Sequence, residues 1–173
     1  MLFMFSNAQE DVKLTAKEQR KAEKAKIKKE KEEKEAANWI VSQKIAAEKQ
    51  FVVQINRVGT KVMSERLNFI YFNKDRAVIQ IETNQYFADN GLGGMTIDGT
   101  PNNYKYTPPK NDKKPIFINF DVTSKFRSGV LNVSITITQD GLATIAFGSA
   151  SAIYGTFYSI EESNINMGVD MRN

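Results

Sequence analysis

From residue 51 onward, the chain consists of short runs in which apolar and polar residues alternate. The clearest run spans residues 131–138, where Leu, Val, Ile and Ile alternate with Asn, Ser, Thr and Thr. Because successive side chains of a β-strand point to opposite faces of a sheet, this period of two predicts a strand with one buried face. The same pattern predicts further half-buried strands over residues 51–56, 77–82, 116–123, 144–147 and 153–160.

Turn signals separate these predicted strands. Asp140-Gly141 is a strong hairpin signal, and Asn73-Lys74-Asp75 separates two shorter strands. About eight or nine strands with hairpin-sized links predict a mainly β fold, an antiparallel up-and-down meander that closes into a barrel of about eight strands. A two-sheet β-sandwich shows the same alternation and stays open as the alternative. A barrel of that size is either filled by side chains or just large enough for one small ligand.

The segment before residue 50 has a different pattern. Thr15-Ala16-Lys17-Glu18 has the form of a capping box, and the absence of Gly and Pro up to about Gln50 predicts one long charged helix. Lys and Glu four residues apart, as at Lys26 and Glu30, predict ion pairs on its surface. Its last third carries an apolar face that we expect to dock on the β-strands, formed by Ala36, Trp39, Ile40, Val41, Ile45 and Ala46.

These patterns divide the chain into three parts. Residues 1–8 are interpreted as the remnant of an export signal, because an apolar run precedes small residues at Ser6 and Ala8. Residues 9–49 form a charged helical arm that docks at its C-terminal end, and residues 50–173 form the antiparallel β domain. We therefore expect a periplasmic or secreted protein, a monomer, and no membrane span, because no run reaches the roughly 18 apolar residues that a spanning helix needs.

No histidine and no cysteine occurs in the chain. Enzymes rely on these side chains for most proton transfer near neutral pH, for thiolate attack and for transition-metal binding. The composition therefore argues against most enzyme classes and predicts neither a metal site nor a cofactor. No catalytic residue is assigned.

The net charge of +4 and the pI of 9.2 do not indicate a nucleic-acid partner. The positive excess lies mostly before Phe51, where lysines are interleaved with glutamates. A basic nucleic-acid surface concentrates arginine or combines basic and aromatic residues, and neither pattern occurs here. We expect a solvated helix with mixed charge and no nucleic-acid partner.

The glycine-rich segment at residues 89–99 is the most unusual stretch of the predicted β domain. A phosphate-binding loop would lead into a helix and carry Gly-Lys-Ser or Gly-Lys-Thr, whereas an alternating run follows here. We interpret the glycines as a bulged turn, or as positions where another strand passes close to the backbone. The neighbouring Tyr86, Asn90 and Tyr104 are candidates for a ligand or surface patch.

Several segments together resemble a family of small exported proteins of Bacteroidetes that is catalogued as a domain of unknown function. The resemblance covers almost the entire chain and rests on the Lys/Glu-rich helix, residues 50–53, residues 90–99, Tyr104, residues 154–157 and Glu161-Glu162-Ser163. It implies a lipocalin-like β fold and an envelope location. It carries over no catalytic residue.

Two functional hypotheses remain open. The first is a non-catalytic binding or interaction module, in which the surface near Tyr86, Asn90 and Tyr104 contacts a small ligand or an envelope component. The second is a hydrolase of envelope glycans that uses carboxylates alone, which requires two acids to converge in one cleft. The candidate acids for such a pair are Asp89, Asp98, Asp121, Glu161 and Glu162.

Overall fold

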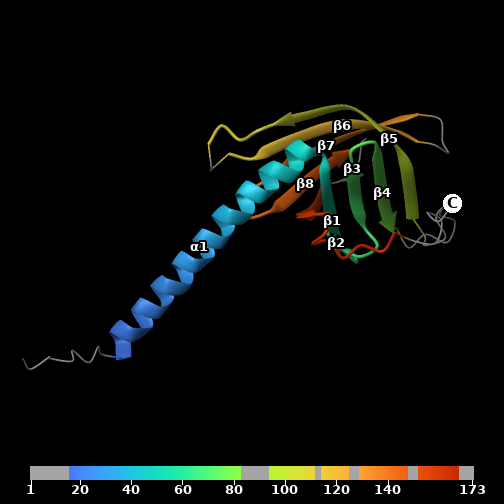
Figure 1. Ribbon diagram of the computed structural model, residues 1–173. Coiled ribbons are helices and arrows are strands. Elements are labelled where there is room, and N and C mark those ends of the chain that lie inside the picture. The colour runs from blue at the N-terminus through green and yellow to red at the C-terminus, as the bar shows by residue number, and fades with distance from the viewer. Residues whose placement is uncertain (1–15, 83–93, 112–113, 125–128, 148–151, 168–173) are drawn as a thin grey trace, which may run out of the picture. The chain divides into compact units, whose positions relative to one another are not determined.

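The computed structural model describes residues 16–82, 94–111, 114–124, 129–147 and 152–167. Among these residues, one helix precedes nine strands (Figure 1). Their bounds are α1 (Ala16–Glu48), β1 (Gln50–Val58), β2 (Lys61–Val62), β3 (Phe69–Asn73), β4 (Arg76–Glu82), β5 (Gly94–Thr107), β6 (Ile116–Ser124), β7 (Val130–Ile137), β8 (Leu142–Phe147) and β9 (Ile153–Ser159). The described residues include no helix that combines the length and the hydrophobicity needed to cross a bilayer.

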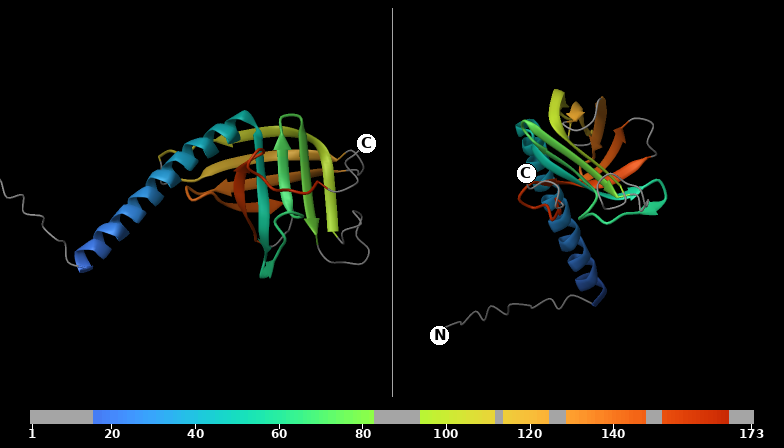
Figure 2. Two further views of the ribbon diagram at one scale, coloured as in Figure 1. Left: turned by 60° about the horizontal axis from the view of Figure 1, so that its bottom comes forward. Right: turned by 90° about the vertical axis from the view of Figure 1, so that its right-hand side faces the viewer.

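The strands form a closed antiparallel barrel. They follow the order β2-β1-β3-β4-β5-β6-β7-β8-β9, and β9 pairs in turn with β1. Strand β2 pairs with β1 alone among the described strands, so eight strands close the barrel and β2 is an extra strand at its rim. The closure is visible in the two views of Figure 2. This topology confirms the predicted meander and sets aside the sandwich.

Two local predictions about glycine are confirmed. Gly141 has a φ of 80° in the turn between β7 and β8, and the Thr138 N–H donates a hydrogen bond of 2.9 Å to the Leu142 carbonyl. Gly99 has no space for a side chain, because an added Cβ would lie 2.1 Å from the Thr123 carbonyl oxygen on β6. The glycine therefore permits the close approach of β5 and β6. Residues 83–93, which include the first part of the glycine-rich segment, lie outside the described residues.

Side chains fill the barrel interior. One apolar cluster takes buried residues from each of the eight barrel strands. Phe72 lies at its centre, with its ring centroid 5.1 Å from that of Phe51 and 4.8 Å from that of Phe120. The described inward side chains thus form a packed core.

Strands β1, β3 and β4 are buried on both faces, which corrects the expectation that every strand has one solvated face. Their inward residues join the interior cluster, whereas Val52, Phe69 and Val78 form a second cluster on the outer face. Ile160 and Ile165, in the segment that follows β9, pack against this second cluster. The alternation correctly separated the two faces, but it did not show that a chain segment covers the outer one.

The last turns of α1 pack on the core through Trp39, Ser42 and Ala46, which are 2%, 8% and 0% exposed. The expected apolar face is therefore only partly right. Ile40 and Val41 are 69% and 45% exposed, and Ala36 is exposed as well. Helical geometry explains the difference, because Ile40 and Val41 are turned by about 100° and 200° around the axis from Trp39.

Candidate functional site

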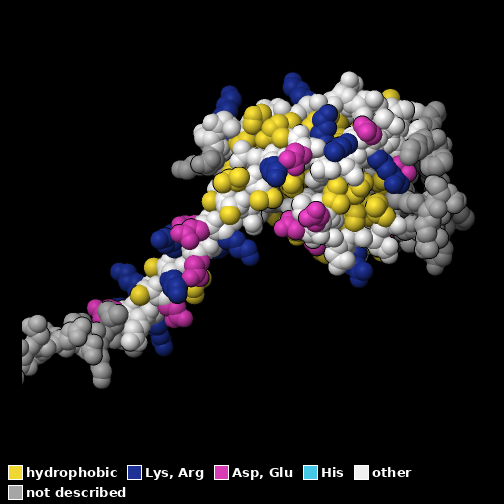
Figure 3. Space-filling view, in the orientation of Figure 1, with side chains coloured by type: hydrophobic (Ala, Val, Ile, Leu, Met, Phe, Trp, Pro, Cys, Tyr) yellow, Lys and Arg dark blue, Asp and Glu magenta, His cyan; other side chains and the backbone are white. Residues whose placement is uncertain are grey.

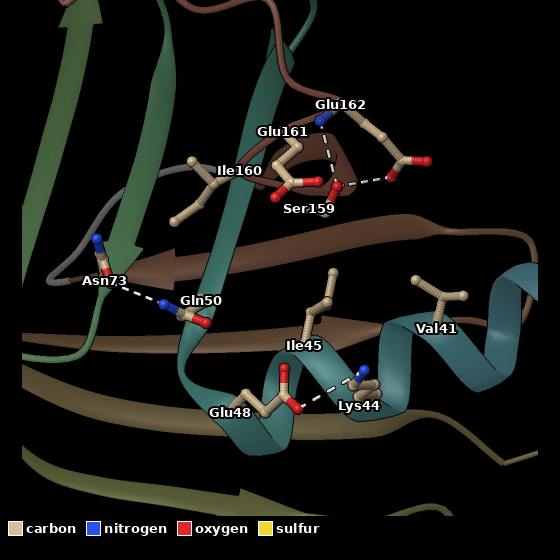
Figure 4. Close-up of a pocket in the computed structure, with 10 residues that line it drawn as sticks. All are labelled: Val41, Lys44, Ile45, Glu48, Gln50, Asn73, Ser159, Ile160, Glu161 and Glu162. Atoms are coloured by element: carbon tan, nitrogen blue, oxygen red, sulfur yellow. Dashed lines mark hydrogen bonds and ion pairs between the residues drawn. The ribbon is translucent and has the colours of Figure 1, made fainter.

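An open groove of about 550 Å³ lies where the end of α1 meets the barrel (Figure 4). Its walls come from α1 and from the segment at the end of β9, and the ends of β1 and β3 supply the remaining residues. The lining residues are Val41, Lys44, Ile45, Glu48, Gln50, Asn73, Ser159, Ile160, Glu161 and Glu162. Three of them are apolar, four are charged and three are neutral and polar.

The helical wall is a single stripe of α1. Val41, Lys44, Ile45 and Glu48 lie three or four residues apart, so their side chains share one side of the helix. Lys44 Nζ lies 3.9 Å from Glu48 Oε1. The stripe therefore presents two apolar side chains beside one ion pair.

Contacts within the β domain hold the end of this helix in place. The Tyr104 hydroxyl on β5 donates a hydrogen bond to the Ala46 carbonyl. Lys49 ends the helix in the left-handed region with a φ of 60°, and its carbonyl accepts a hydrogen bond of 2.8 Å from the Lys74 N–H. The Lys49 ammonium also lies 5.2 Å from the centre of the Tyr104 ring, a distance at which cation–π attraction operates.

The opposite wall is a tight turn after β9. The Ser159 hydroxyl donates a hydrogen bond of 2.9 Å to Glu162 Oε2, and the Glu162 N–H donates one of 3.2 Å back to Ser159 Oγ. Ile160 is anchored in the outer cluster, and its carbonyl accepts a hydrogen bond of 2.8 Å from the Ser163 hydroxyl. These bonds fix the backbone of the turn that carries Glu161.

Two amides line the groove between these walls. Gln50 and Asn73 are partners in the pairing of β1 with β3, and Gln50 Nε2 donates a hydrogen bond of 3.4 Å to Asn73 Oδ1. Asn73 Nδ2 donates in turn to the Tyr71 hydroxyl at 3.1 Å. The strand register therefore places both amides at the same edge of the barrel.

The groove carries an excess of negative charge. Glu48, Glu161 and Glu162 contribute three carboxylates and Lys44 one ammonium group, which leaves a net charge of −2. Among the described residues, Glu161 makes neither a hydrogen bond nor an ion pair, and Figure 4 shows it and Ile45 extending into the groove from opposite sides. This arrangement can attract a cationic group and can pack an apolar group beside it.

Of the three residues predicted for a ligand patch, the structure describes Tyr104. Its ring packs against Phe72, with 5.0 Å between centroids, and burial raises the pKa of its hydroxyl. This position gives Tyr104 a role in holding the helix, and its predicted contact with a ligand stays a prediction. Tyr86 and Asn90 lie outside the described residues.

Among the candidate acids that the structure describes, Asp98 and Asp121 lie on different strands, whereas Glu161 and Glu162 are neighbours in the turn after β9. Arg76 binds Asp98 through two hydrogen bonds of 2.9 and 3.1 Å. Asp121 is exposed on β6, and hydrogen bonds from Asn103 and then Asn132 lower its pKa, which keeps it ionised. Because Asp121 pairs with Asn102, four residues along β5 from Asp98, the two acids stand about 13 Å apart along the strands.

That separation exceeds the roughly 5 to 9.5 Å at which two carboxyl groups cooperate in glycoside hydrolysis. Asp89 lies outside the described residues. The part of the chain that the structure describes also holds no group of three or more acids placed to bind a metal ion.

The groove itself was missed in the sequence, although each of its parts left a signal there. Val41 and Ile45 belong to the predicted docking face, and Asn73 belongs to a predicted turn. The sequence analysis names Glu161 and Glu162 as candidate acids for hydrolysis and as part of the family resemblance. One signal could have found the site. Val41 and Ile45 lie four residues apart, so they share one side of the helix, and this side differs from the side of Trp39 and Ala46.

Comparisons with known proteins agree with this fold. A sequence profile described as Domain of unknown function (DUF4251) matches residues 27–152. A crystal structure of a DUF4251 family protein from Bacteroides eggerthii is similar to the chain with 25% sequence identity and a TM-score of 0.57. The similarity covers 72% of this chain and 91% of that chain. No match was found among curated proteins.

Proposed function

The chain belongs to the DUF4251 family, and we propose that it is a non-catalytic binding module whose site is the groove beside the end of α1. The observation that carries this proposal is the pairing of an apolar wall with an excess of carboxylates in an open space of about 550 Å³. Ligand sites in proteins occupy about 300 to 1,000 Å³ and combine apolar surface with a few polar groups. The groove has both properties.

The filled interior supports a site on the outside of the barrel. A small eight-stranded barrel can hold one ligand only where its inward side chains leave room. Here Phe51 stacks on Phe72 in the interior, Phe120 meets Phe72 edge to face, and Trp39 from α1 joins the same cluster. A ligand inside the barrel would have to displace these rings.

The groove favours a ligand that carries positive charge next to an apolar group. Val41, Ile45 and Ile160 provide the apolar contact, and Glu161 provides a carboxylate that the described residues leave unpaired. Because the groove is open, the ligand is a segment of a larger molecule or a short chain lying along it. A peptide in which a lysine or arginine neighbours an aliphatic residue has this chemistry.

Fluorescence anisotropy with a labelled peptide of alternating lysine and leucine tests the proposal. We expect saturable binding of this peptide to the full chain, and the matching peptide of glutamate and leucine should not compete with it. The double variant Glu161→Gln/Glu162→Gln should weaken binding by about fivefold, because two partly solvated charge contacts are lost. The variant Glu32→Gln/Glu33→Gln removes an equivalent pair of adjacent glutamates from the helix and is the control.

Equal affinity of the wild type and the Glu161→Gln/Glu162→Gln variant would contradict the proposed site. So would displacement of the basic peptide by the acidic one at equal concentration, because the net charge of the groove would then have no effect. Circular dichroism of both double variants shows whether the fold is intact. Exposed glutamates are replaced in each case, so we expect unchanged spectra.

We also propose that the protein works in the cell envelope. Support comes from the apolar run at residues 1–5 followed by small residues at Ser6 and Ala8, the spacing that a signal peptidase recognises. Fractionation of cells that express the gene from its own locus, followed by N-terminal sequencing, tests this location. A periplasmic or secreted protein is expected, and a cytoplasmic protein that keeps Met1 would contradict it.

A further inference from the structure

We propose that the first half of α1 binds the anionic surface of a phospholipid bilayer through a cationic face formed by Lys17, Arg20, Lys21 and Lys24. This face belongs to the part of the chain before Glu35 and is independent of the groove. All four side chains are exposed. The inference therefore concerns a second surface with the opposite charge.

The spacing of the four cations places them together. At about 100° of rotation per residue, they fall within a sector of roughly 100° on one side of the helix. Lys28 and Lys31 continue the same row toward the middle of α1. The row from residue 17 to residue 31 is about 21 Å long, at 1.5 Å of rise per residue.

The cationic face differs from the rest of the helix in its pairing. Lys26, Lys28 and Lys29 each have a glutamate four residues later, at distances of 3.7 to 3.9 Å. No ion pair of Lys17, Arg20, Lys21 or Lys24 occurs among the described residues. Figure 3 shows side chains of both charges along the helix, and the sequence places the unpaired cations near its start.

This arrangement does not stabilise the helix itself. Lys17 lies four residues from Lys21, and Arg20 four residues from Lys24, so like charges are neighbours on the surface. Cations near the N-terminus of a helix also oppose its macrodipole. An anionic partner would relieve both effects, so the face has the properties of a binding surface.

A lipid surface fits this face better than a nucleic acid does. Ile27 is 58% exposed and lies between Lys24 and Lys31 in the same row, three residues after one and four before the other. Interfacial helices combine lysines with apolar residues in this way, and clusters of four to eight cations bind anionic lipids. Residues 16–34 contain one arginine and no aromatic residue, so the groups that most often contact bases are scarce.

Cosedimentation of the full chain with vesicles tests the proposal. We expect binding to vesicles in which one third of the lipid is phosphatidylglycerol, no binding to pure phosphatidylcholine, and release at about 500 mM NaCl. Circular dichroism should show a gain of helix on binding, because the like charges are then neutralised. The variant Ile27→Gln should bind several-fold more weakly.

Two triple variants separate the cationic face from total charge. Near an anionic surface each lysine strengthens adsorption roughly fivefold, so removing three from the face should weaken binding roughly 100-fold. Removing three lysines from other sides of the same helix should change the affinity for the vesicles by less than about threefold. The two variants are Lys17→Gln/Lys21→Gln/Lys24→Gln and Lys26→Gln/Lys29→Gln/Lys34→Gln.

Equal losses in the two triple variants would overturn the proposal, because total charge and not the face would then govern binding. Binding to phosphatidylcholine alone would overturn it as well. A third contradicting result is tighter binding to duplex DNA than to the anionic vesicles at the same salt concentration, which would identify a nucleic-acid surface. The peptide assay of the groove is unaffected by each of these outcomes, so the two proposals fail separately.

Discussion

The two halves of the barrel differ in what covers their outer faces. On β1, β3 and β4 the outward residues Val52, Phe69 and Val78 are fully buried, whereas on β6 the outward Phe117 is 43% exposed among polar neighbours. The sequence differs as well, because outward Val52, Phe69 and Val78 interrupt the alternation in the first half, whereas the outward positions of β6 after Phe117 are polar. The covered half lies under the segment that follows β9, and this segment also forms one wall of the groove. The same chain segment thus covers the outer face of these strands and forms part of the groove.

Buried amides complete the cover of the first half. Asn68 is fully buried, donates a hydrogen bond of 2.8 Å to the Ser64 carbonyl and accepts one of 2.6 Å from the Glu82 N–H. Gln80 Nε2 donates to the Leu67 carbonyl at 2.9 Å. On the exposed half, Asn119 instead accepts a hydrogen bond from the Ser134 hydroxyl in solvent. The same polar residue types therefore support a buried network in one half and a hydrated surface in the other.

Replacing one phenylalanine on each outer face gives the largest expected contrast. Phe69→Ala should lower the free energy of unfolding by about 3 to 5 kcal/mol, because it leaves a cavity in a buried cluster. Phe117→Ala should lower it by less than about 1 kcal/mol, because the ring is already partly solvated. Urea denaturation of both variants measures the difference. Equal losses would show that the two faces do not differ in burial.

The same contrast can be made with asparagine. Asn68→Ala should cost about 1 to 3 kcal/mol, because it removes the acceptor of the Glu82 N–H in a buried site, whereas the Ser64 carbonyl keeps the backbone N–H groups of Leu67 and Asn68 as donors. Asn119→Ala should cost less than about 0.5 kcal/mol, since water replaces its bond. Thermal unfolding of the two variants measures the two stability losses. An Asn68→Ala variant as stable as the wild type would contradict the expected difference.

Tyr104 sharpens the comparison at the helix end, where its hydroxyl bonds the Ala46 carbonyl. Tyr104→Phe should cost about 0.5 to 1.5 kcal/mol near neutral pH. Because burial raises the pKa of Tyr104, its contribution is complete below pH 10 and is lost at higher pH, where the unfolded chain releases the proton first. Absorbance at alkaline pH should show the Tyr104 hydroxyl as a late step that follows Tyr106, whose pKa burial also raises. The variant should lack that late step, and an unchanged titration curve would contradict the assignment.

Removing residues 1–35 has the smallest expected effect. Residues 17–34 are exposed along α1, so their loss should change the free energy of unfolding by less than about 0.5 kcal/mol. The remaining residues 36–173 should unfold in one cooperative transition, followed by calorimetry. A collapse of folded structure after this deletion would show that the early helix contributes to the core.

The sequence predicted the barrel because its period of two is regular, as at residues 131–138, and because Asp140-Gly141 marks a hairpin. The outward apolar residues Val52, Phe69 and Val78 left a signal of a second buried face. The sequence could not identify its cover, because the contacts of Ile160 and Ile165 with these residues are tertiary. The predicted docking face of α1 was only partly correct for a related reason. Hydrophobicity identified Trp39 and Val41 alike, and only packing shows that Trp39 is buried and that Val41 lines the groove.

The central claim is that ligands bind in the groove and that the barrel interior is closed to them. Amide chemical shifts of the nitrogen-15-labelled chain, recorded during titration with the peptide of lysine and leucine, test it most directly. Shifts confined to residues that line the groove, such as Lys44, Asn73 and Glu161, are expected. Shifts centred on inward residues such as Phe120 and Ile135 would contradict the claim and place the ligand inside the barrel.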